Sequence, residues 1–91
     1  MRIDILCKPD GNGRCQQTLE NVREALMDLA IEAEVHVFRD KRKMIDHRAY
    51  LSPALVVDDN LRVCGRVPDP LEIRNMIRER PRYRKRFDEV A

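Results

Sequence analysis

The spacing of apolar residues predicts two short strands in the first half of the chain. In residues 2–7, Ile3 and Ile5 stand beside polar neighbours, and residues 33–39 repeat this alternation with two valines. A period of two places every second side chain on the same face, as in a strand with one buried face. We therefore expect a strand at each of these two places.

A hairpin is expected in residues 53–65. Two short apolar runs flank the polar residues 58–60, which is the pattern of two strands joined by a tight turn. We expect a three-residue loop in which Asn60 takes the left-handed conformation, because asparagine tolerates it.

Helical spacing occurs in three segments. In residues 15–30, four apolar side chains lie three or four positions apart: Leu19, Val22, Leu26 and Leu29. Charged residues occupy the other face of this predicted helix. Residues 69–80 begin with Asp69 as the expected N-cap and Pro70 at the first helical position, and Glu72 is placed to complete a capping box. Pro81 is expected to end this helix.

Residues 40–51 form a weaker helical pattern. Asp40 can cap the segment. Three basic residues in its first turn oppose the helix dipole, because positive charge is unfavourable at a helix N-terminus.

The predicted order is β-α-β-α-β-β-α, which defines an α/β fold. A helix joins the first two strands, so they should run parallel with a right-handed crossover. The last two strands form the hairpin. The sequence therefore predicts one four-stranded mixed sheet with helices on both faces.

Composition limits this fold to one domain. The chain has 91 residues, of which 43% are hydrophobic, enough for a single modest core. We assign residues 1–80 to the domain and residues 81–91 to a basic C-terminal tail, which lacks a clear period and is expected to fray. Residues 1–77 hold 12 basic and 13 acidic side chains, so the net charge of +2 arises in the last 14 residues, which hold six basic and three acidic ones.

No stretch approaches the roughly 20 apolar residues that span a bilayer, and the polar start does not fit a signal peptide. The chain has three cysteines. With no export signal and an odd cysteine count, we expect a cytoplasmic protein, in which a disulfide would be functional rather than structural.

The loop "CKPDGNGRC" between the first strand and the first helix raises several chemical possibilities. A metal site would need Cys64, His36 or His47, but no two of these have the short spacing of zinc ligands. A [2Fe–2S] cluster would need four cysteines. The sequence "GNGRCQ" has Gln16 where a dinucleotide-binding loop needs glycine. We therefore expect no cofactor and no metal here.

The basic run at residues 80–86 could contact nucleic acid or an acidic partner. Such runs are more often solvated tails, and we do not expect nucleic-acid binding.

The segment "LSPALVVDDNLRVCGRVPDPLEI", residues 51–73, resembles the small thioredoxin-like redox-active disulfide proteins of bacteria and archaea. In that family a Thr-Pro or Ser-Pro opens the third strand, and Gly-Arg-Val follows the fourth. The segment "CQQTLENVREAL", residues 15–26, is similar to the family's first helix. The resemblance covers about residues 1–80 and implies the thioredoxin fold.

The family's active site is a Cys-x-x-Cys motif at the start of the first helix. Alignment places Cys15 on the second cysteine and Asn12 on the first, giving Asn-Gly-Arg-Cys. Cys15 would lie in the first turn, where helix amides and the neighbouring Arg14 favour a thiolate. Asn12 is expected to cap the helix through the amide of Cys15. Because they lie in the family's active-site motif, Asn12 and Arg14 are also expected to contact the substrate.

Cys7 is a candidate replacement for the missing cysteine. The flexible loop between it and Cys15 allows the Cα separation that a disulfide needs. Cys7 could equally just finish a buried strand, and Cys64 is expected to pack on its strand. Ser52-Pro53 matches the family's cis-proline position, which lies beside the active-site sulfur and binds substrate.

Two functions remain open. The first is a thiol–disulfide redox protein, a candidate oxidoreductase, acting on a protein thiol or disulfide, with Cys15 as the reactive thiol and Cys7 as its partner. The second is a non-catalytic binding module that keeps the substrate groove and has lost the chemistry.

Overall fold

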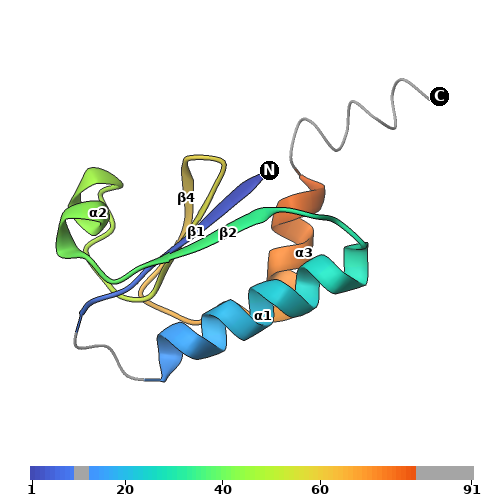
Figure 1. The fold of residues 1–91 in the computed structure, drawn as a ribbon, viewed down its shortest axis with the longest axis horizontal. Coiled ribbons are helices and arrows are strands. Elements are labelled where there is room, and N and C mark those ends of the chain that lie inside the picture. The colour runs from blue at the N-terminus through green and yellow to red at the C-terminus, as the bar shows by residue number, and fades with distance from the viewer. Residues whose placement is uncertain (10–12, 80–91) are drawn as a thin grey trace.

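The computed structural model describes residues 1–9 and 13–79 (Figure 1). Its elements follow the predicted β-α-β-α-β-β-α order. The strands are β1 (Arg2–Leu6), β2 (Glu34–Phe38), β3 (Ala54–Val57) and β4 (Asn60–Cys64). The helices are α1 (Arg14–Leu29), α2 (Lys41–Asp46) and α3 (Pro70–Arg78).

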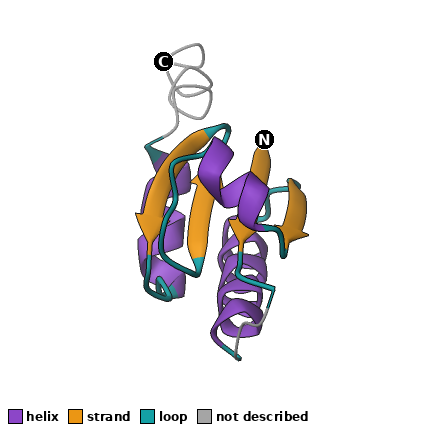
Figure 2. Cartoon of the chain, turned by 90° about the vertical axis from the view of Figure 1, so that its left-hand side faces the viewer, coloured by secondary structure: helices purple, strands orange, loops and turns teal. Residues whose placement is uncertain are grey.

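The four strands form one mixed sheet in the order β2-β1-β3-β4. β1 and β2 are parallel, with Ile3 opposite Val35, while β3 runs antiparallel to both β1 and β4. Helices α1 and α3 lie on one face and α2 lies on the other (Figure 2). The predicted fold class is therefore confirmed: the sheet is mixed and both faces carry helices.

Alternating residues of the strands build a core on each face of the sheet. On the α1 and α3 face, the strands contribute Ile3, Ile5, Leu55, Val57 and Val63. These side chains pack against residues of α1 and α3: Val22, Ala25, Leu26, Ile73, Met76 and Ile77. On the α2 face the cluster is smaller: Leu6, Ala54, Val56, Met44 and Ala49. The larger core extends to the end of β1, where the candidate site begins.

The two expected acidic caps are present. The Asp40 carboxylate accepts from the amide of Arg42, and the Asp69 carboxylate accepts from the amide of Glu72. Both oxygens of Glu72 accept from the guanidinium of Arg66, and the backbone of Asp69 also hydrogen-bonds this carboxylate, as a capping box requires. Helix α2 is also shorter than expected, because it ends at Asp46. Arg48 has a φ of 58°, and this left-handed conformation is incompatible with continuing the helix.

The hairpin differs from its prediction in loop length. β3 ends at Val57 and β4 begins at Asn60, so the loop has two residues, and Asp58 and Asp59 have φ values of 45° and 68°. A two-residue loop with positive φ at both positions matches the right-handed twist of the flanking strands. Asn60 is therefore the first residue of β4, and the prediction of a three-residue loop is wrong.

A bulge lies in β4. Leu55 stands opposite Val63 while Val56 stands opposite Leu61, so Arg62 is the extra residue. The bulge places Val63 on the α1 and α3 face and leaves Leu61 on the other.

None of the helices in the described part of the chain is long and apolar enough to cross a membrane. The predicted tail, residues 81–91, lies outside the described residues.

Candidate functional site

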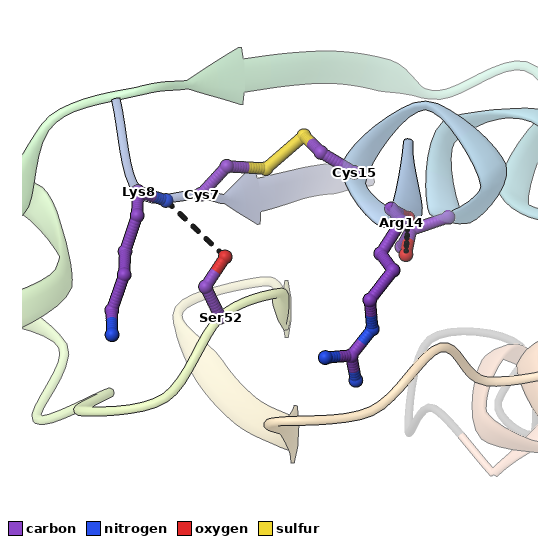
Figure 3. The surroundings of a disulfide bond; sticks show 6 residues. Cys7, Lys8, Arg14, Cys15 and Ser52 are labelled. Carbon is purple, nitrogen blue, oxygen red and sulfur yellow. Dashed lines mark hydrogen bonds between the residues drawn. A yellow bond between two sulfur atoms is a disulfide. The ribbon is translucent and has the colours of Figure 1, made fainter. Parts of the chain in front are cut away.

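Cys7 and Cys15 are joined by a disulfide (Figure 3). Their Cα atoms are 6.2 Å apart, within the range that disulfides occupy. Both are buried, with 1% of Cys7 and 5% of Cys15 exposed. The pair that the sequence left open is bonded in the structure.

The strand and the helix bring the two sulfurs together for separate reasons. Cys7 continues the alternation of Ile3 and Ile5, so its side chain faces α1, and its amide donates to the Phe38 carbonyl at 2.8 Å. Cys15 lies on the inner face of α1 with the core residue Val22. The sulfurs therefore meet at the edge of the larger core.

Among the described residues, no side chain caps the start of α1. Gly13 is the N-cap residue, and no acidic residue lies in the first turn. The Gly13 carbonyl accepts from the amide of Gln17 at 3.0 Å. Cys15 is the second residue of the helix, so its sulfur lies in the first turn, where partial positive charge stabilises a thiolate. Asn12, the expected cap, lies outside the described residues.

Arg14 is anchored away from the sulfurs. Its guanidinium donates to the carbonyl of Gly65 at 2.9 Å, and its own carbonyl accepts from the Thr18 hydroxyl at 2.9 Å. Figure 3 shows the side chain extending toward the segment that follows β4, whereas the sulfur of Cys15 points to Cys7. Arg14 therefore links the helix start to the end of the hairpin.

The Ser52–Pro53 segment lies beside the end of β1 (Figure 3). Its peptide bond is cis, and the Ser52 hydroxyl accepts from the amide of Lys8, the residue after Cys7, at 3.2 Å. The Pro53 carbonyl accepts from the amide of Gly65 at 2.9 Å. The structure thus places Cys7, Ser52 and Pro53 in one neighbourhood, while their roles toward a substrate remain a proposal.

Gly65 also belongs to this neighbourhood, although the sequence did not indicate it as a site residue. Its φ is 88°, and a Cβ there would lie 2.9 Å from the Cβ of Leu51. Glycine is required because other residues disfavour this conformation and would clash with Leu51. The signal was present in the Gly-Arg-Val motif, which begins at this glycine.

Two large apolar side chains precede Ser52 and are exposed. Tyr50 is 68% exposed and Leu51 is 59% exposed. Lys8 and Pro9 are also exposed on the segment after β1. The segments joined by the bond between Lys8 and Ser52 therefore both present accessible side chains.

Arg66 and Glu72 hold the chain between β4 and α3. Their two hydrogen bonds measure 2.8 and 2.7 Å. The guanidinium of Arg66 lowers the pKa of Glu72 below its ordinary value of 4.5, because it stabilises the carboxylate. This ion pair follows directly on Gly65 and helps to fix the position of the motif.

Cys64 does not belong to the site. It is exposed, and its thiol lies 3.5 Å from the Leu51 carbonyl. It stands opposite Ala54, which packs on the α2 face, so it points to the opposite side of the sheet from the disulfide. The expectation that Cys64 packs on its strand is wrong, because the bulge at Arg62 places it on the α2 face, where it is exposed.

The two histidines and Cys64 do not come together either. Within residues 1–9 and 13–79, no group of three His, Cys, Asp or Glu side chains could hold a metal ion.

Comparison with known proteins gives one consistent result. A profile of the thioredoxin domain family matches residues 1–78. A thioredoxin of Methanothermobacter thermautotrophicus is 31% identical over 67 residues, which cover 74% of this chain and 87% of that protein. A thioredoxin of Methanocaldococcus jannaschii is 28% identical over 80 residues, covering 86% and 92%. The fold, the disulfide at the start of the first helix and these matches show that the chain belongs to the thioredoxin domain family.

Proposed function

We propose that this protein exchanges electrons with protein thiols and disulfides through Cys7 and Cys15. The observation that carries the proposal is the disulfide between these residues at the first turn of α1. The pair takes the place of a Cys-x-x-Cys motif whose first position holds Asn12 in this chain. A purely binding module would have no need of a bonded pair at this position.

Cys15 is the attacking thiol in this proposal. It lies in the first turn of α1, where the helix amides stabilise its thiolate, and it is slightly more exposed than Cys7. Cys7 lies at the end of a buried strand and is the resolving thiol. The choice rests on this helix position, because the alignment places Cys15 on the second cysteine of the motif and Asn12 on the first.

The exchange has two steps. The Cys15 thiolate attacks one sulfur of a partner disulfide, a mixed disulfide forms, and the other partner sulfur leaves as a thiolate that takes up a proton. Cys7 loses its proton and attacks the sulfur of Cys15. The second partner sulfur then leaves and is protonated, so two electrons and two protons have passed to the partner. The reverse sequence oxidises a partner dithiol.

The Ser52–Pro53 segment and Arg14 serve the partner in different ways. Ser52 and Pro53 lie next to the residue after Cys7, so we propose that the partner chain lies along this segment and over the exposed Tyr50 and Leu51. Arg14 positions the helix start through Gly65. We also propose a reducing cytoplasm as the compartment, where the dithiol form can be regenerated.

Equilibration in glutathione redox buffers, followed by alkylation and peptide mass spectrometry, tests the proposal. As the buffer becomes more oxidising, the alkylated fractions of Cys7 and Cys15 should fall together, as expected for a two-electron couple. Cys64 should remain alkylated. The reduced protein should also reduce the interchain disulfides of insulin, and Cys15→Ser should abolish this activity. Cys64→Ser is the matched control and should retain it.

Two results separate the alternatives. If Cys7 and Cys15 remain alkylated at every glutathione ratio, the redox proposal is wrong and a binding module is the better account. If the pair titrates but Cys7→Ser, rather than Cys15→Ser, abolishes formation of the mixed disulfide, the assignment of the attacking thiol is reversed.

A further inference from the structure

We propose that the protein self-associates through β2, with two copies pairing their β2 strands antiparallel to form one continuous eight-stranded sheet. The inference is independent of the redox proposal, because β2 contributes no side chain to the disulfide site and meets it only where the Phe38 carbonyl accepts from the Cys7 amide. It rests on the free edge of β2, the apolar side chains along it, and the opposite charges at its two ends.

β2 is an edge strand that lies open among the described residues. The sheet order places it beyond β1, and Figure 2 shows no described element on its outer side. The Glu34 amide donates to the Met1 carbonyl, and the Phe38 carbonyl accepts from Cys7, so the even-numbered residues face β1 with their backbone groups. By alternation, the backbone groups of Val35 and Val37 point outward, toward an incoming strand.

The two edges of the sheet differ in how they resist pairing. β4, the opposite edge, contains the bulge at Arg62, whose guanidinium is also held by Glu79 at 2.8 Å. Bulges and charged side chains are common devices that prevent edge pairing. The strand β2 has no bulge, proline, lysine or arginine between Glu34 and Phe38.

The side chains of β2 leave apolar surface uncovered on both faces. Val37 is 36% exposed, Val35 is only partly buried against the larger core, and Phe38 is only partly buried against the smaller one. An antiparallel pair centred on His36 would place Val35 opposite the partner's Val37, twice by symmetry. The side chains of these four valines, two from each copy, would then cover one another on the α1 face.

Charge complementarity selects a second copy in this register. Acidic Glu32 and Glu34 lie at the start of β2, while four basic residues and one acidic residue follow its end: Arg39, Asp40, Lys41, Arg42 and Lys43. Antiparallel pairing brings each acidic start against the partner's basic end. Glu34 would stand opposite the partner's Phe38, and in each copy the Lys43 ammonium lies 4.9 Å from the centroid of the Phe38 ring. Glu34 and the partner's Lys43 would thus form two symmetric ion pairs.

A five-residue edge forms a small interface, so the association should be weak. Sedimentation velocity on the full chain, from about 10 µM to about 1 mM, measures this association. The upper concentration would detect a dimer with a dissociation constant of about 1 mM. A Cys64→Ser background excludes an intermolecular disulfide through the exposed thiol. The expected result is a concentration-dependent rise of the average mass toward a dimer.

Substitutions test the register. Val37→Pro should abolish the dimer and keep the fold, because the Val37 amide points away from β1. Glu34→Lys and Lys43→Glu should each weaken association about fivefold, as expected for the loss of two exposed ion pairs, and the double variant should restore it to within about twofold. Arg62→Glu on the other edge is the control and should change nothing.

A chain that stays monomeric up to 1 mM overturns the proposal. So does a Val37→Pro variant that is folded by circular dichroism and associates like its parent. If that variant unfolds, the charge-swap pair decides, and a double variant no better than either single one refutes the register.

Discussion

Reduction of the Cys7–Cys15 bond should destabilise the protein by an amount set by the length of the loop it closes. The two cysteines are 8 positions apart in the sequence. In the chain-entropy description, a crosslink over a loop of this length removes about 2.5 kcal/mol of conformational freedom from the unfolded chain. The folded state should change little, since both cysteines are buried in an intact core and the sulfur atoms remain there as thiols.

The expected shift in melting temperature is large enough to measure directly. For a domain of this size, 1 kcal/mol corresponds to roughly 4–8 °C, so reduction should lower Tm by about 10–20 °C. Thermal unfolding followed by circular dichroism, with and without dithiothreitol, provides the two values. Reduced wild-type protein is preferable to serine variants, because a serine hydroxyl in this core adds a desolvation cost of its own.

Cys64→Ser supplies the control for this measurement. Because Cys64 is exposed and unbonded, the variant should melt like the wild type in both conditions. A difference below about 3 °C between oxidised and reduced protein, under 1 kcal/mol by the same conversion, would refute the entropic reasoning. Loss of the difference in Cys64→Ser would show that another thiol pair is responsible.

Three further predictions concern the end of the hairpin and the tail. The pKa of Glu72 is lowered in the folded state, so its pairing with Arg66 stabilises the protein fully above pH 4.5. This stabilisation is lost as the pH falls through the pKa of the folded state. In urea unfolding measured against pH, Glu72→Gln should therefore remove that part of the acid dependence. Gly65→Ala should cost about 1–2 kcal/mol, from positive φ and from contact with Leu51, and a change below 0.5 kcal/mol in urea unfolding would contradict this. Truncation after Pro81 should lower Tm by less than about 5 °C in a calorimetric scan, because the family match ends at residue 78, and a larger shift would show that the tail stabilises the domain.

The order of elements was predictable because periods of two and of 3.6 residues alternate clearly along this chain. Local chemistry also fixed two helix starts: the carboxylates of Asp40 and Asp69 accept the amides that the sequence indicated. The bond of Glu72 to Arg66 has no local signal, because Arg66 reaches the carboxylate through the path of the loop before α3.

The site was less predictable than the fold. The alternation in β1 indicates the face of Cys7, but the distance to Cys15 depends on how α1 packs on the sheet. The exposure of Cys64 depends on the bulge at Arg62, which changes the face of the residues around it. The bulge has no signal in the apolar pattern, because a single extra residue in a strand leaves its composition unchanged.

The pairing of β1 on both of its sides has a consequence for biosynthesis. Its parallel partner, β2, is complete by residue 38, so β1, α1 and β2, with both bonded cysteines, emerge as one β-α-β unit. Its antiparallel partner arrives much later, since Ile3 pairs with Val57, 54 positions along the chain. Until the ribosome has released that residue, the inner edge of β1 has no partner within the sheet. Contacts between residues so distant in sequence form slowly. The nascent domain therefore passes through an interval in which the central strand of the finished sheet is itself an edge, and edges of this kind are sites of aggregation during synthesis.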